Sequence, residues 1–124
     1  MIGLLIKPDN TFEVIEINRT TFLEECHTYL NADSIDFAYS NTNKFNIPFM
    51  AVVDDVGVCK GLKENLLASV VMCRTFPLCG DVLLFEYADT DGDGYSAVSL
   101  SALGQSCVSQ LKELLAEKLE KGEI

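Results

Sequence analysis

An aspartate-rich stretch is the first group of residues in this sequence whose spacing suggests chemistry. Asp89, Asp91, Asp93 and Gly94 match the opening of an EF-hand loop, in which alternate carboxylates converge on calcium and the glycine allows a sharp bend. That loop requires a glutamate at its twelfth position, and here the position is Leu100. The flanking residues alternate as strands do, so we predict a hairpin turn with weak or no calcium binding.

Nucleophilic or acid–base catalysis would need residues that the sequence does not place together. The one histidine, His27, follows Cys26 in a predicted helix, where residues at i and i+1 do not face each other. Acid–base catalysis needs two carboxylates in different environments, but Asp54 and Asp55 share a predicted turn that is open to solvent. Recognised phosphate-binding glycine loops are also missing. We therefore expect a protein that is not an enzyme and needs no cofactor.

Arg74 is the basic residue that the sequence singles out for anion binding. It is one of two arginines, with Arg19, and it lies between an apolar helix and Phe76. A guanidinium beside an aromatic ring can hold a phosphate or a carboxylate. The alternative is an arginine at a helix end that binds backbone carbonyls.

Hydrophobic periodicity predicts the elements that position these residues. Thr21 and Glu24 have the spacing of a capping box at the start of a helix that ends near Asn31. Strands are predicted at 2–6, 12–17, 34–39, 48–54, 58–60, 81–87 and 95–99, and further helices at 62–73 and from 101 onward. The order ββαβββαββα indicates one α+β domain over residues 1–124. We expect a mainly antiparallel sheet of five to seven strands with two to three helices.

The C-terminal helix has an apolar stripe at helical spacing that includes Val108, Leu111 and Leu115. The stripe either covers the sheet or forms a short seam in a homodimer. Both interpretations stay open at this point.

Charge and cysteine content narrow the range of partners. The chain has 9 basic and 19 acidic residues, a net charge of −10, which argues against binding nucleic acid or an anionic membrane. The charge serves either solubility or an acidic face that binds a basic partner. Five cysteines with no metal or redox spacing indicate reduced thiols, and no signal peptide or membrane span is evident, so we expect a cytoplasmic protein. The residues of the candidate acidic face are Asp54, Asp55, Glu86, Asp89, Asp91 and Asp93.

Residues 52–101, together with the opening hairpin at 1–17, resemble a family known as domain of unknown function 3846. The matching positions are Lys7-Pro8, Asp54–Gly57, Gly61-Leu62 with Asn65 and Ala68, Gly80–Leu83, Asp93-Gly94 and Val98–Leu100. Members occur in bacterial phages, prophages and conjugative elements. They often carry Arg or Pro after the Asn, where this chain has Leu66.

The resemblance implies a small accessory protein of a mobile element, and such proteins often counter host defence. One mechanism is an anti-CRISPR-like inhibitor whose acidic face occupies a basic host effector. A second is a sponge that sequesters a cyclic-nucleotide or ADP-ribose-type immune signal. A third is a structural or regulatory module of the element. For the sponge, the candidate ligand-binding residues are Asn65, Arg74, Phe76 and Tyr87.

Overall fold

The computed structural model describes residues 1–40, 45–73, 77–89 and 95–123, and in these ranges the protein is an α+β fold, as predicted. The first half contains β1 (Ile2–Ile6), β2 (Phe12–Glu16), a short 3₁₀ helix η1 (Arg19–Thr21), α1 (Phe22–Leu30), β3 (Ile35–Ser40) and β4 (Phe49–Asp54). The second half contains α2 (Leu66–Val71), β5 (Val82–Asp89), β6 (Tyr95–Val98) and α3 (Ala102–Glu120).

The strands form one antiparallel sheet of six, in the order β2-β1-β5-β4-β3, with β6 added beside β5. Strand β5 pairs with β4 along one edge and with two strands in succession along the other. It pairs with β1 as far as Leu84, opposite Leu4, and with β6 from Glu86, opposite Val98. The sheet therefore has a junction where β5 exchanges one partner for another.

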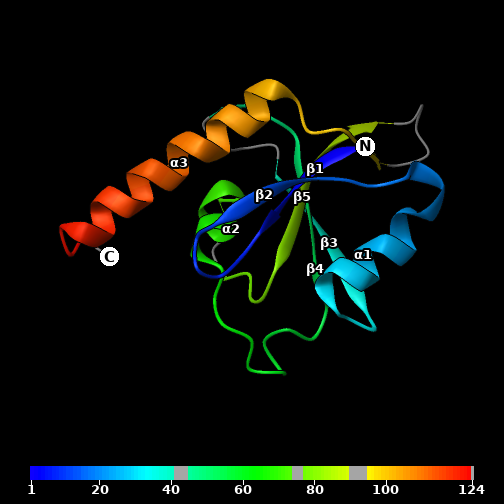
Figure 1. The fold of residues 1–124 in the computed structure, drawn as a ribbon, viewed down its shortest axis with the longest axis horizontal. Coiled ribbons are helices and arrows are strands. Elements are labelled where there is room, and N and C mark those ends of the chain that lie inside the picture. The colour runs from blue at the N-terminus through cyan, green and yellow to red at the C-terminus, as the bar shows by residue number, and fades with distance from the viewer. Residues whose placement is uncertain (41–44, 74–76, 90–94, 124) are drawn as a thin grey trace.

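Helices cover both faces of the sheet, α2 and α3 on one side and α1 on the other (Figure 1). The first half of β5, residues 82–85, is consequently buried on both faces, as its uninterrupted apolar run indicates. Val82 and Leu84 pack in the cluster beneath α2 and α3, whereas Leu83 and Phe85 pack beneath α1. Alternate residues of one strand thus supply two separate hydrophobic cores.

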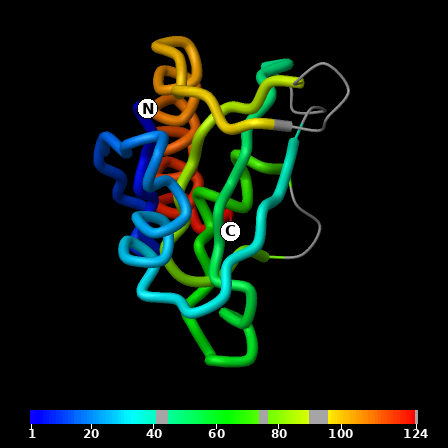
Figure 2. Tube along the Cα trace, turned by 90° about the vertical axis from the view of Figure 1, so that its right-hand side faces the viewer, coloured from blue at the N-terminus to red at the C-terminus, as the bar shows by residue number. Residues whose placement is uncertain are grey.

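The strand predicted at residues 58–60 is wrong. Backbone hydrogen bonds from Gly57 to Asp54, from Lys60 to Val56 and from Gly61 to Val58 close successive turns instead. Because these bonds are satisfied locally, the segment does not join the sheet, and it extends beyond the end of β4 (Figure 2). The hairpin predicted at Asp54–Gly57 is therefore a series of turns.

Two helix starts also differ from prediction. The N-cap of α2 is Asn65, whose side chain accepts a hydrogen bond from the Ala68 amide, so α2 begins later than residue 62. At α1 the Thr21 side chain makes no cap bond. It donates instead to Glu25 Oε2 at 2.8 Å, so Glu25 and not Glu24 is the carboxylate that braces this turn.

Within the described residues, no helix combines the length and the apolarity that a membrane crossing requires.

Candidate functional site

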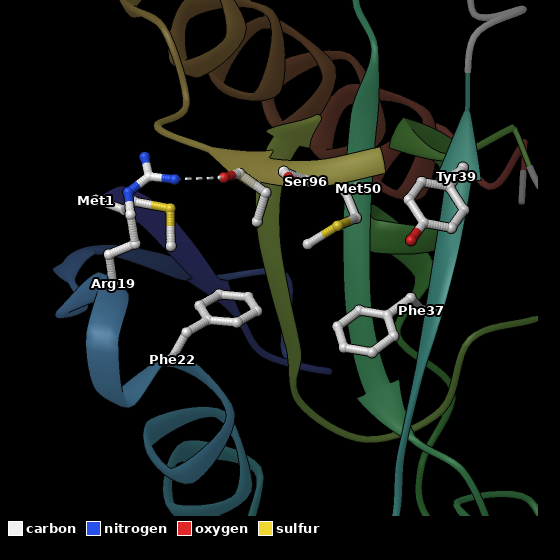
Figure 3. A pocket seen from close by; sticks show the side chains of 8 residues that line it. Met1, Arg19, Phe22, Phe37, Tyr39, Met50 and Ser96 are labelled. Atoms are coloured by element: carbon white, nitrogen blue, oxygen red, sulfur yellow. Dashed lines mark hydrogen bonds between the residues drawn. The ribbon is translucent and has the colours of Figure 1, made fainter. Parts of the chain in front are cut away.

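An open hollow of about 280 Å³ lies on the α1 face of the sheet, beyond the part that α1 covers. Its walls come from segments far apart in sequence: the chain start, η1, α1, β3, β4 and β6. Figure 3 shows aromatic side chains on two sides of it and a guanidinium at its edge. We call this site the aromatic hollow, and its lining residues are Met1, Arg19, Phe22, Phe37, Tyr39, Met50, Ser96 and Ala97.

The hollow adjoins the junction where β6 replaces β1 beside β5. Two hydrogen bonds hold the ends of these strands together. The Leu100 amide donates to the Ile2 carbonyl at 2.8 Å, and the Ile2 amide donates to Ser99 Oγ at 3.0 Å. Since Met1 and Ala97 each adjoin this junction, the hollow depends on the antiparallel pairing of β5 with both strands.

Phe22, the first residue of α1, is positioned by a chain of close contacts. Its ring meets that of Phe85 edge-on, with centroids 5.3 Å apart and an angle of 69° between the planes. The Phe85 ring occupies the space above Gly3, where an added Cβ would lie 2.5 Å from Phe85 Cε1. The missing side chain of Gly3 therefore lets Phe85 sit low on the sheet and support Phe22 at the wall of the hollow.

Arg19 is the basic side chain of the aromatic hollow. Its Nη1 donates to the Ala97 carbonyl at 3.3 Å, and among the described residues it takes part in no ion pair. The turn that carries it is held by Glu25 Oε2, which accepts hydrogen bonds from the Asn18 amide at 2.9 Å and from the Thr21 hydroxyl. Arg19 is exposed to solvent, and its one hydrogen bond among the described residues leaves other N–H groups of the guanidinium for a ligand.

Tyr39 closes the side of the hollow that is formed by β3. Its ring meets that of Tyr87 edge-on, with centroids 5.1 Å apart. Tyr87 was predicted as a ligand-binding residue, and it contacts Tyr39 but is not among the residues that line the hollow. Its contact with the Tyr39 ring supports that wall of the hollow.

Asn65, another predicted ligand-binding residue, does not line the aromatic hollow. Asn65 is fully buried, and its side chain donates to the carbonyls of Ile6 and Gly80 and accepts from the Ala68 amide. These bonds commit the Asn65 amide to the fold, which removes it from the candidate ligand contacts. Arg74 and Phe76 lie outside the described residues.

The candidate acidic face is not a single surface. Asp54 is buried and accepts hydrogen bonds from Lys60 Nζ at 2.7 Å and from the Val56 amide. Asp89 lies at the opposite end of the sheet. Because Val52 pairs with Leu83 in antiparallel register, Asp54 lies level with the position two residues before Leu83. Asp89 is about eight residues, or ~26 Å, further along that strand. Asp55 is exposed beside Asp54.

Glu86 lies with neither Asp54 nor Asp89. It caps α3 on the face of the sheet opposite α1, where it accepts hydrogen bonds from the Ser101 amide at 2.7 Å and the Ser101 hydroxyl at 2.6 Å. Asp91 and Asp93 lie outside the described residues. The strands on either side of them pair as a hairpin, with Asp89 opposite Tyr95.

Cys26 and His27 each have a packing role. Burial first, and the Glu25 carboxylate second, raise the pKa of the Cys26 thiol to about 12. His27 Nδ1 lies 2.7 Å from the Ala32 carbonyl, which can only accept, so this nitrogen carries the proton. The imidazole thus bonds the chain just after the end of α1. In the described part of the chain, no three His, Cys, Asp or Glu side chains cluster as a metal site requires.

The stripe on α3 faces the protein's own core. Val108 and Leu115 are buried against the sheet and α2, and Leu111 packs at the edge of the same cluster. Of the two interpretations, the packing of these three residues supports the one in which the helix covers the sheet. The exposed leucines of α3 are Leu103, Leu114 and Leu119.

Sequence reasoning missed the hollow although some of its signals were visible. The alternation of Ile35, Phe37 and Tyr39 predicts that these three share one face of a strand. It does not show where α1 ends above that face. Arg19 carries no local signal, because only the tertiary fold brings it to Ala97, 78 positions later.

The chain matches no protein-family model, and comparisons with curated proteins and with solved structures found no significant match.

Proposed function

We propose that this protein acts by binding, and that it sequesters a small ligand unchanged in the aromatic hollow. The observation that supports this function is the convergence on one open cavity of Phe22 from α1 and of Phe37 and Tyr39 from β3, beside Arg19. Small-molecule sites are typically concave and mostly apolar, with few polar groups that fix orientation. In the setting that the family resemblance implies, this would be a counter-defence sponge in a bacterial host.

A second candidate function is inhibition of a basic host effector by an acidic surface. The net charge of −10 favours it, because complementary potential steers association. The separation of Asp54 from Asp89 and the capping role of Glu86 weigh against the particular surface predicted. The sponge therefore ranks above the inhibitor.

The test is a binding screen with recovery of the ligand. Purified protein is titrated with adenosine 5′-monophosphate, ADP-ribose and cyclic di-AMP, and binding is followed by thermal shift and calorimetry. We expect at least one of them to bind, and the ligand released by denaturation to be chemically unchanged. Phe37→Ser should abolish binding, whereas Val14→Ser, at an exposed position on β2, should not.

Failure of all three probes would contradict a sponge for nucleotide-type signals, and a changed product would indicate an enzyme. The inhibitor predicts something different, namely binding to a basic protein with an affinity that falls steeply as salt rises.

A further inference from the structure

We infer, on the basis of the proposed function, that the ligand of the aromatic hollow is one planar ring system carrying one anionic group. The ring lies between Phe22 and Phe37, and the anion meets the guanidinium of Arg19. This assigns Arg19 as the residue that selects anionic over neutral ligands.

The place of the ring follows from the two phenylalanines. Phe22 points into the hollow from α1 and Phe37 points into it from β3, so the two side chains approach from opposite sides (Figure 3). Met50, from β4, lies between them. Aromatic rings and a polarisable thioether favour contact with the face or edge of another ring. A flat ligand can therefore contact apolar groups on both sides, which a flexible aliphatic chain would do only at a greater cost in entropy.

The place of the anion follows from Arg19. Among the described residues its guanidinium makes one hydrogen bond, to the Ala97 carbonyl, and a guanidinium has five N–H groups in a planar fork. The fork matches the oxygens of a phosphate or a carboxylate. Because no carboxylate of the described residues pairs with Arg19, an anionic ligand would not have to displace one.

Size and charge together limit the ligand to one ring and one anion. The volume of about 280 Å³ lies just below the usual range of ligand pockets. That is room for a ligand near the size of a nucleoside monophosphate, and the second half of a cyclic dinucleotide would remain outside. A chain of net charge −10 with one arginine at the site also disfavours ligands with several charges.

The test compares four probes that separate ring from anion. Adenosine 5′-monophosphate and 2-naphthoate each carry a ring and an anion, one as phosphate and one as carboxylate. Adenosine carries the ring alone, and cyclic di-AMP doubles both features. We expect adenosine 5′-monophosphate or 2-naphthoate to bind at least tenfold more tightly than adenosine and cyclic di-AMP, and the tighter of the two identifies the anion.

The variant that tests the assignment is Arg19→Gln, with Lys7→Gln as its control at an exposed position outside the hollow. Arg19→Gln should weaken the anionic probe by about 10- to 100-fold, leave adenosine unchanged and keep the melting temperature. Lys7→Gln should change nothing.

Two results would overturn the inference and leave the proposed function standing. One is binding that Phe37→Ser abolishes but Arg19→Gln does not affect. The other is a preference for cyclic di-AMP. Failure of every probe, ADP-ribose included, would overturn both.

Discussion

The side-chain nitrogen of Asn65 lies 2.9 Å from the carbonyl oxygen of Ile6, 59 positions earlier in the chain. The same nitrogen donates to the Gly80 carbonyl, and the side-chain oxygen accepts from the Ala68 amide. One buried amide thus joins the end of β1, the start of α2 and the segment before β5. An asparagine that was predicted from the sequence as a candidate ligand-binding residue is instead a structural link.

Asn65→Ala should lower the free energy of unfolding by about 3 kcal/mol, because it removes a helix cap and leaves two buried carbonyls without a donor. Urea denaturation followed by circular dichroism measures this. Asn18 provides the matched control, since it caps η1 at the surface through the Thr20 amide. Asn18→Ala should cost no more than about 1 kcal/mol. Equal costs at the two sites would contradict the structural role of Asn65.

Gly3→Ala should lower the free energy of unfolding by about 1–3 kcal/mol, because the added methyl group would lie 2.5 Å from the Phe85 ring in a packed core. The same displacement should move Phe22 and weaken any ligand of the aromatic hollow. A double-mutant cycle with Phe85→Leu checks the cause. In the Phe85→Leu background the cost of Gly3→Ala should largely disappear. If Gly3→Ala costs as much in the Phe85→Leu background, the contact with the Phe85 ring is not the source of the strain.

The fold was largely predictable from sequence because its elements have clear local signals. The apolar run at residues 82–85 and the acidic alternation at 12–17 indicate strands whatever surrounds them. The strand predicted at 58–60 was wrong. Valine favours strands, but the turn that begins at Asp54 and Gly57 determines the backbone conformation of this segment.

The candidate site was much less predictable, for a physical reason. The hollow exists because α1 covers only part of one sheet face and because β6 succeeds β1 beside β5. Both are long-range arrangements. The positions of the acidic residues were equally hard to predict: the adjacent Asp54 and Asp55 differ in burial, and Glu86 bonds a helix end that lies 15 positions later.

Asp54 should make stability depend on acid pH. A hydrogen bond from the Lys60 ammonium, with further help from the Val56 amide, holds the pKa of the Asp54 carboxyl below its ordinary value. The ionised form therefore stabilises the fold above the ordinary pKa of about 3.9, and this stabilisation is lost as pH falls through the lower folded-state value. Lys60→Met should lower the free energy of unfolding by about 1 kcal/mol at pH 7, since Lys60 is partly exposed.

The difference between Lys60→Met and the parent protein should shrink as pH falls below about 4. Urea denaturation at several pH values between 7 and 2 follows it. Lys63→Met, at an exposed lysine that forms no ion pair with the described residues, should show neither effect. A pH-independent difference at Lys60 would mean that the lysine acts through packing alone.

Cysteine reactivity should separate the buried thiols from the exposed ones. The reactive form of a thiol is the thiolate. With a pKa of about 12, Cys26 is ionised in only about one molecule in 10,000 at pH 8, and its side chain has no exposure to solvent. Cys59 and Cys73 are exposed.

Iodoacetamide at pH 8 should therefore modify Cys59 and Cys73 first in the folded protein, as followed by mass spectrometry. Cys26 should react only at the rate of unfolding, and urea should bring all three rates together. Glu25→Gln should change the Cys26 rate little, since burial is the larger cause of its raised pKa. Modification of Cys26 as fast as Cys59 without urea would mean that α1 opens from the sheet, and with it the wall of the aromatic hollow that Phe22 forms.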